Sequence, residues 1–382
     1  MLKRLILVLF SVGMGLGLVE IGIRISPPAE FARYRSFRYL FLPDPLIRFT
    51  LKPNIKCNIE SEAGGTFQVE TNSFGFRDPA YHGKDGRRNI LGLGDSFLFA
   101  DSNAREDGMF ALLQQMLDGR SSGRWRAINA GVPGYGTNQE ILYYFERGAR
   151  DFDPNVVVLF FYMNDVIFTT SVDRNEWEFR RGIPVAAMIA ADQFSVDTVY
   201  QEPRDDGGYK TAQFLRFLWQ IYWKNSRQIK PPAKKSNVAG VEACMFHKTM
   251  FRRQKYRFTN LWAIIKHLKK QAWLNGAKLM IVYVPAAREA EDGFARQMYY
   301  DMYDCPKSDW DWTLCIREME SIAQDVGVPF VNLIPAFKDH WDKTGQSLYF
   351  KGFGHFTPEG HRLAAAAILP ELEKVLNSLD SE

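Results

Sequence analysis

The sequence predicts a protein of the α/β class, in which helices cover both faces of a parallel β-sheet. Short, wholly apolar runs that are typical of buried parallel strands alternate with segments of helical periodicity. Several apolar runs end directly in Gly, Asp or Asn, the residue types that form tight turns. The chain has 382 residues, which is enough to bury a large core. This alternation favours strand–helix–strand units and therefore a parallel sheet.

Each predicted element has its own sequence pattern. A short strand at residues 66–70 comes first. Apolar runs of strand length follow at residues 89–93, 127–130, 156–162, 278–284 and 328–333. Apolar residues recur at helical spacing at residues 109–117, 139–149, 258–273 and 316–325. The last helix is expected to begin at Thr357-Pro358, because a capping hydroxyl is followed by a proline in the first turn.

The N-terminal residues predict a targeting or membrane segment. Lys3 and Arg4 precede an apolar run that reaches Val19 and continues past Glu20 to Ile25. A positive start followed by such a run indicates a signal peptide or a signal anchor. The run is just long enough to span a bilayer if Glu20 lies at the interface. No A-x-A cleavage site follows, which favours an uncleaved anchor over a removed signal peptide.

The remaining pattern divides the chain into further segments. Residues 26–70, with scattered Pro, Arg and aromatic residues, are expected to connect the segment 1–25 to a domain at 71–382. Within that domain, residues 167–255 interrupt the alternation of strands and helices with clusters of Pro, Gly, Lys and aromatic residues. We interpret 167–255 as an insertion that forms a lid or cap.

The cysteines bear on metal binding and on the cellular compartment. They form no C-x-x-C pair and have no histidine at ligand spacing, so a zinc site is not expected. Cys305 and Cys315 lie close enough in sequence for a local disulfide in an oxidising compartment, and two buried thiols are the alternative. We place the body of the protein outside the cytoplasm, although arginines after the apolar run weaken the charge bias that sets orientation.

Two classes of ligand are not expected. A formal charge of +4 is too small for the concentrated basic surface that binds nucleic acid. Gly92-Leu93-Gly94 lacks the third glycine of a dinucleotide-binding fingerprint, because Phe97 occupies that position. We therefore predict no nucleic-acid partner, no metal and no cofactor.

Polar residues stand where the predicted strands end, at the edge where parallel sheets bind ligands. Gly94-Asp95-Ser96 follows the strand 89–93, and a serine there lies beside N–H groups that can stabilise an oxyanion. The glycine-rich segment 129–137 allows close backbone approach, and Asn164-Asp165 offers an amide donor. His355 can remove the proton that makes Ser96 a poor nucleophile. Taken singly, each segment is equally explained by turn chemistry or packing.

Taken together and in this order, the four segments resemble the SGNH/GDSL hydrolases, which are named after Ser, Gly, Asn and His residues in four sequence blocks. The resemblance makes Ser96 the nucleophile and His355 its base. It assigns the oxyanion hole to the Ser96 N–H, the Gly134 N–H and the Asn164 side chain, and it implies a serine hydrolase that needs no cofactor.

The resemblance also implies a fold and a location. The expected fold is a three-layer α/β/α, flavodoxin-like parallel sheet, and Asp95 and Asp165 are expected to support the site. Residues 71–77 resemble the approach to the nucleophile in membrane-anchored bacterial members. This implies a single-pass protein of the inner membrane with its catalytic domain in the periplasm, or a secreted protein if the segment is cleaved.

One departure from the family pattern concerns the residue that orients the base. In the family an aspartate usually stands two or three residues before the histidine, but here those positions are Phe353 and Gly352. We therefore expect a Ser–His dyad in which a backbone carbonyl orients His355, or an acid supplied by Asp339 or Asp342. Loss of the orienting acid from a triad lowers turnover by about four orders of magnitude.

Three functions are compatible with this reading. The leading hypothesis is an esterase or O-acyltransferase that acts on an acylated, and specifically O-acetylated, envelope or exported polysaccharide. The second is a catalytically retired scaffold that binds glycan or assembles with partners, and it is motivated by the missing acid. The third is a lipase or lysophospholipase with an apolar lid within 167–255. Trp310 and Trp312 can stack on sugar rings, and ordinary aromatic packing is the alternative.

Overall fold

The computed structural model describes residues 2–28, 31, 33, 36–37, 39–44, 46–81, 83, 85–121, 123–168, 179–180, 183–184, 210–218, 243–303, 305–352 and 354–380. Its centre is a five-stranded parallel sheet with strand order β11-β10-β7-β5-β6. The strands are β5 (Arg88–Gly94), β6 (Trp125–Gly131), β7 (Val156–Phe161), β10 (Lys278–Tyr283) and β11 (Phe330–Asn332). The predicted α/β class and all five predicted core strands are confirmed.

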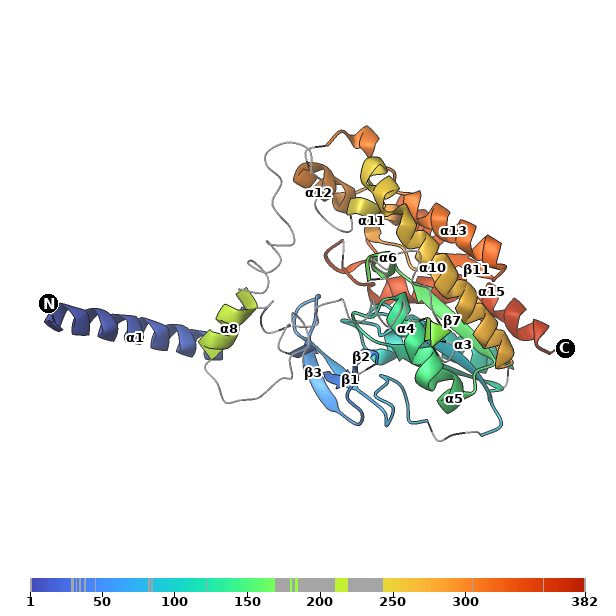
Figure 1. Cartoon of the computed structure of the whole chain (residues 1–382), viewed down its shortest axis with the longest axis horizontal. Helices are drawn as coiled ribbons and strands as arrows, with labels where there is room; N and C mark the ends of the chain where they lie inside the picture. Colours follow the sequence, from blue (N-terminus) through green and yellow to red (C-terminus); the bar gives the residue numbers. More distant parts are fainter. Residues whose placement is uncertain are drawn as a thin grey trace.

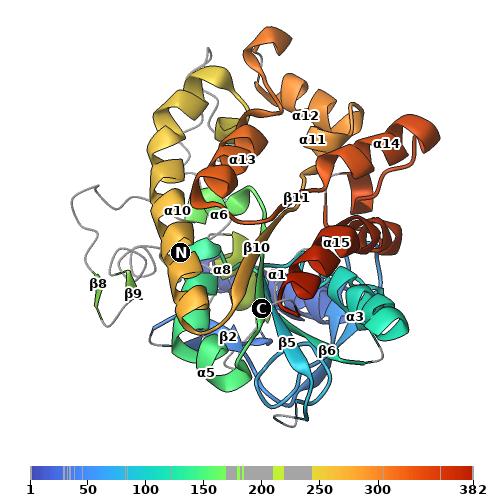
Figure 2. The same ribbon diagram turned by 90° about the vertical axis from the view of Figure 1, so that its right-hand side faces the viewer.

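Helices pack on both faces of this sheet, as Figure 2 shows. Successive residues of each strand point to opposite faces, so Val157 and Leu159 of β7 join one core cluster while Val158 and Phe160 join the other. The first face is covered by α4 (Thr137–Tyr143), α10 (Lys248–Leu274) and α13 (Leu314–Val326). The second face is covered by α3 (Met109–Ser121), α14 (Ile334–Thr344) and α15 (Pro358–Ser378). This is the expected three-layer α/β/α arrangement.

Several helix boundaries differ from the prediction. The helix expected at 139–149 is α4 followed by a π-helical turn at Tyr144–Gly148 and by α5 (Ala149–Phe152). Helix α10 begins at Lys248, well before the predicted start, because Phe251 already packs into the core despite its basic neighbours. At the last helix, the Thr357 hydroxyl accepts a hydrogen bond from the Gly360 N–H, which confirms the predicted cap.

Two hairpins precede the sheet. The first joins β1 (Phe41–Asp44) to β2 (Arg48–Leu51), and the second joins β3 (Lys56–Glu60) to β4 (Thr66–Glu70). Strand β4 is the predicted short strand. Apolar side chains of both hairpins are buried in the same cluster as the first face of the sheet: Phe49, Leu51, Ile59 and Val69. The Tyr135 hydroxyl also donates to the Phe49 carbonyl. Residues 41–70 therefore pack onto the sheet domain.

The N-terminal residues form α1 (Leu2–Ile25), which extends away from the body of the protein (Figure 1). Its part from Ile6 to Ile25 is long and apolar enough to cross a membrane, although a signal sequence meets the same criterion. Helix α8 (Lys210–Leu218) packs against its C-terminal end. The Glu20 carboxylate accepts hydrogen bonds from the Lys210 and Thr211 backbone N–H groups and from the Thr211 hydroxyl.

Most of the segment interpreted as an insertion or lid, residues 167–255, lies outside the described residues. The described parts are β8 (Phe179–Arg180), β9 (Ile183–Pro184), α8, a 3₁₀ turn at Ala243–Met245 and the start of α10.

The cysteine and tryptophan predictions have clear outcomes. The expected Cys305–Cys315 disulfide is not formed, and all four cysteines are thiols. Cys315 is fully buried in α13, which supports the alternative of buried thiols. Trp310 and Trp312 are both buried and stack on each other, with ring centroids 5.3 Å apart. Their faces are occupied by aromatic packing, so they do not form a sugar-binding platform.

Candidate active site

Ser96 lies at the carboxyl end of the central strand β5. Wholly buried residues of β5 lead to Gly94, and the serine follows in a tight bend where its side chain is partly exposed. The bend depends on close packing, because a Cβ at Gly94 would lie 2.9 Å from the Leu98 Cβ. The Ser96 Oγ lies 2.7 Å from the His355 Nε2. The structure therefore brings together the two side chains that the sequence proposed as nucleophile and base.

His355 is held in a loop between α14 and α15. Its carbonyl accepts a hydrogen bond from the Phe350 N–H, and its ring packs beside Phe97, with centroids 5.0 Å apart. The Nδ1 lies 3.0 Å from Glu62 Oε1, and the backbone N–H of His355 donates to Glu62 Oε2 at 2.9 Å. A carboxylate only accepts, so in the neutral imidazole Nδ1 carries the proton and Nε2 is left to accept from Ser96.

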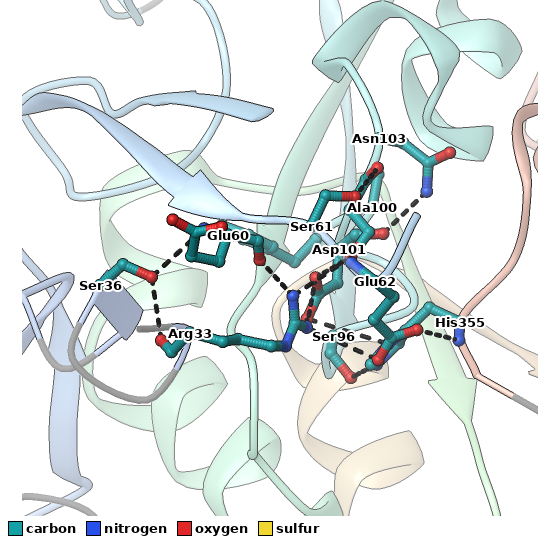
Figure 3. A network of polar contacts seen from close by, with 12 residues as sticks. Arg33, Ser36, Glu60, Ser61, Glu62, Ser96, Ala100, Asp101, Asn103 and His355 are labelled. Atoms are coloured by element: carbon teal, nitrogen blue, oxygen red, sulfur yellow. Dashed lines mark hydrogen bonds and ion pairs between the residues drawn. The ribbon is translucent and has the colours of Figure 1, made fainter. Parts of the chain in front are cut away.

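Glu62 corrects the expectation of a Ser–His dyad. It lies in the turn between β3 and β4 and contacts the histidine with both carboxylate oxygens, as Figure 3 shows. The acids proposed earlier, Asp339 and Asp342, form exposed ion pairs with lysines of α14 instead. Phe353 lies outside the described residues. Gly354 provides the necessary space, because a Cβ there would lie 2.3 Å from Glu62 Oε2.

Glu62 and His355 each stabilise the charged form of the other. Burial alone would raise the pKa of Glu62, but its hydrogen bonds and charge interaction with His355 and the nearby Arg33 lower it to about 2. Burial alone would lower the pKa of His355, but the carboxylates of Asp101, Glu62 and Asp95 raise it to about 9. At neutral pH the resting site therefore holds an imidazolium, and the free base forms as the pH rises.

The three groups expected to form an oxyanion hole follow the carboxyl ends of the neighbouring strands β5, β6 and β7. Among the described residues, neither the Ser96 N–H nor the Gly134 N–H donates to another protein atom. Gly134 has φ +83°, a conformation that favours glycine. The Asn164 Nδ2 donates to Asp95 Oδ2 at 2.9 Å with one of its two hydrogens. Asp95 thus holds the Asn164 amide, whose second Nδ2 hydrogen donates to no protein atom among the described residues.

The loop that carries Gly134 is fastened to the nucleophile loop. The Asn129 Nδ2 donates to the Leu98 carbonyl, while the Asn129 Oδ1 accepts from the Gly131 N–H. A Cβ at Gly131 would lie 2.6 Å from the Phe99 backbone nitrogen, so only glycine allows this approach. The two loops are therefore held in a fixed relation.

Asp165 directly follows Asn164 in the chain. It is fully buried, and its Oδ2 accepts from the Tyr162 N–H at 3.1 Å. Burial, together with the neighbouring Asp95, raises its pKa well above the usual range. Burial likewise raises the pKa of Glu140 well above the usual range. Asp165 and Glu140 are therefore two buried acids that interact electrostatically with Asp95. No cluster of three or more His, Cys, Asp or Glu residues among those described could hold a metal ion.

The sequence pattern does not identify Glu62, because the segment around it has the composition of a connector. The available signal was local: Ala63-Gly64-Gly65 directly precedes the predicted strand at 66–70, which indicates a hairpin turn. Nothing in the sequence relates that turn to a histidine 293 residues away.

The chain is similar in sequence to one protein family and in structure to several solved proteins. The sequence model of the GDSL-like Lipase/Acylhydrolase family matches residues 93–363. No curated protein is significantly similar in the search of such sequences. Among solved structures, the chain is similar to TesA (12% identity, 75% of this chain and 99% of that chain, TM-score 0.41). It is also similar to the acetyl xylan esterase AlAXEase (15%, 74% and 98%, TM-score 0.41) and to a catalytic mutant of Axe2, an acetylxylan esterase from Geobacillus stearothermophilus (14%, 76% and 95%, TM-score 0.40).

Proposed function

Because the chain belongs to the GDSL-like lipase/acylhydrolase family, we propose that it is a serine ester hydrolase or O-acyltransferase whose catalytic residues are Ser96, His355 and Glu62. The observation that carries the proposal is the continuous contact from Ser96 Oγ to His355 Nε2 and from His355 Nδ1 to Glu62. A nucleophile, a base and a group that orients the base are the parts that acyl transfer requires.

The proposed reaction has two halves. Ser96 attacks the ester carbonyl while His355 takes its proton, and the developing oxyanion is stabilised by the Ser96 N–H, the Gly134 N–H and Asn164. His355 then protonates the leaving alcohol, which leaves an acyl-enzyme. In the second half His355 deprotonates water or a sugar hydroxyl, which attacks the acyl group and releases Ser96. Glu62 keeps the imidazole in the required tautomer and stabilises its charge.

The proposed substrate is an acylated, and specifically O-acetylated, envelope or exported glycan. The family resemblance of the anchored type and the apolar helix α1 support this choice. A lipase or lysophospholipase is the second candidate. Its support is that Arg33, which lies close in the chain to the apolar helix α1, contacts Asp101 and Glu62 in the site. The retired-scaffold hypothesis was motivated by the absence of an acid near His355, and Glu62 removes that motive.

A series of esters with acyl groups of different length distinguishes the glycan substrate from the lipid substrate. We expect the purified full chain in detergent to hydrolyse 4-nitrophenyl acetate with a higher kcat/KM than the octanoate, because a glycan O-acetylesterase needs to hold only a short acyl group. An acetylated oligosaccharide and an unacetylated acceptor, tested in the same assay, report release and transfer of acetate. A preference for octanoyl esters would support the lipase instead, and no turnover of any ester would contradict the proposed function.

We propose that α1 anchors the protein in the inner membrane as a single span, with the site in the periplasm. Its support is the apolar run from Ile6 to Ile25 together with the positive residues Lys3 and Arg4 before it. Protease added to spheroplasts should then degrade the body, whereas a cytoplasmic marker protein stays intact. Protection of the body in intact spheroplasts, with digestion after lysis, would reverse the proposed orientation.

A further inference from the structure

Arg33, in the segment between α1 and β1, extends its guanidinium group to the candidate site (Figure 3). Its Nη2 lies 2.9 Å from both carboxylate oxygens of Asp101 and 3.6 Å from Glu62 Oε1. Its Nη1 donates to the Glu60 carbonyl and, at 3.3 Å, to the Ser102 hydroxyl. One side chain thus contacts the turn that carries Glu62 and the loop that follows the nucleophile.

Ser36 links the backbone of Arg33 to the second hairpin. The Arg33 carbonyl accepts from the Ser36 hydroxyl at 2.9 Å, and that hydroxyl accepts from the Glu60 N–H at 3.3 Å. The Glu62 N–H in turn donates to the Ser102 hydroxyl at 3.0 Å. The position of Glu62 relative to His355 therefore depends on contacts that Arg33 makes on both sides of the turn.

The charges around the imidazole explain why an arginine is needed there. Glu62 Oε1 and Asp101 Oδ2 lie 3.0 and 3.9 Å from His355 Nδ1, so two carboxylates face one ring nitrogen. Two carboxylates that face the same atom repel each other, and the Asp101 side chain is only 3% exposed. Among the described residues, Arg33 is the one arginine or lysine that forms an ion pair with either carboxylate.

Other titratable groups near His355 do not replace Arg33. Asp95, on the nucleophile side, adds a third negative charge that favours the imidazolium. His361 of α15 stays neutral, because burial lowers its pKa to about 3. Arg77 is buried near Asp101 but donates to backbone carbonyls of four residues: Gln68, Phe99, Ala100 and Asn103.

We infer that Arg33 is a positioning residue of the active site, which holds Glu62 against His355 and neutralises the excess negative charge there. The inference rests on the proposed function, because it assigns a role within the same site. The catalytic centre then includes a residue from the part of the chain between α1 and β1.

The charge and the geometry of Arg33 can be separated with two variants of the full chain in detergent. Arg33→Ala removes both, so we expect kcat to fall by roughly ten- to a hundredfold. It should also move the acid limb of kcat/KM to higher pH by about one unit, since the two carboxylates are no longer compensated. Arg33→Lys keeps the charge but cannot span Asp101, Ser102 and Glu60, so it should keep the wild-type limb and lower kcat.

Arg120→Ala is the matched control, since Arg120 is an exposed arginine that pairs with Glu373 away from the site. The pH dependence of the inactivation rate by diisopropyl fluorophosphate gives a second measure of the same limb. Thermal melts establish whether each variant folds. If Arg33→Ala folds and keeps both kcat and the wild-type acid limb, the inference is wrong. If Arg33→Ala does not fold, an unchanged kcat in Arg33→Lys would show that the inference is wrong.

The two proposals fail in different ways. Absence of ester turnover and of fluorophosphate inactivation in the wild type overturns the proposed function and the role of Arg33 with it. A wild type that turns over esters, with a limb that Arg33→Ala leaves in place, overturns the role of Arg33 alone. A limb that moves to lower pH in Arg33→Ala would mean that Glu62 has moved away from His355, which would support the positioning role and contradict the role in neutralising charge.

Discussion

Replacing Ser96 or His355 by alanine is expected to lower kcat for an activated ester by about a millionfold, and the double substitution is expected to cost no more. The two side chains act as a unit, because the Ser96 Oγ and His355 Nε2 are 2.7 Å apart and the hydroxyl is a poor nucleophile without a base. Activity that remains would come from the oxyanion donors and from substrate binding. The measurement is kcat at saturating 4-nitrophenyl acetate for both single variants and the double variant.

A fluorophosphonate probe gives a direct test of the same unit. It should form one covalent adduct, and mass spectrometry of the digested protein should place that adduct on Ser96. Ser73→Ala, at an exposed serine, and His340→Ala, in α14, are matched controls at residues without a contact to Ser96 or His355, and both should label at the wild-type rate. An adduct on another serine, or a double variant whose loss is the product of the two single losses, would show that Ser96 and His355 do not form the proposed unit.

The core of the fold follows from short-range patterns. Each central strand is a wholly apolar run, such as Val156–Phe161, which is buried on both faces and therefore shows no alternation of polar residues. Ligand sites of parallel sheets form where strands end, so the loops with Ser96, Gly134 and Asn164 could be predicted to meet. The start of α10 could not be predicted from the sequence, because basic residues around Phe251 obscure the apolar face of this helix.

The acid of the site could not be predicted for a different reason. Glu62 reaches His355 through tertiary contacts alone: the hairpin packs on the sheet through Ile59 and Val69, and the turn is held by Arg33. Neither contact has a periodic signature in the sequence. The glycine at position 354 is part of the same solution, because it leaves the space that Glu62 occupies. The sequence showed that the usual aspartate is missing but did not show what replaces it.

Replacing Glu62 with glutamine is expected to lower the plateau kcat by about four orders of magnitude. Glutamine keeps the size of the side chain but can present an N–H to His355, which favours the wrong tautomer of the imidazole. The acid limb of kcat/KM should also move. In the wild type it reflects the raised pKa of His355, about 9, so activity increases as the pH rises through that region. Loss of the Glu62 charge lowers this pKa and shifts the limb to lower pH, opposite to the shift expected for Arg33→Ala.

The loss of kcat in Glu62→Gln depends on Asp101, because the Asp101 Oδ2 lies 3.9 Å from His355 Nδ1 and is the nearest alternative acid. If Asp101 takes over, Glu62→Gln will lose far less than expected, and the double variant Glu62→Gln/Asp101→Asn will lose the remainder. If Glu62 alone orients the base, the double variant will match the single one. Glu70→Gln, an exposed glutamate on the same hairpin that pairs with Lys56, is the matched control for a change of charge. Wild-type turnover in both the single and the double variant would mean that no carboxylate orients His355. The contact at 3.0 Å between Glu62 Oε1 and Nδ1 would then have no catalytic role.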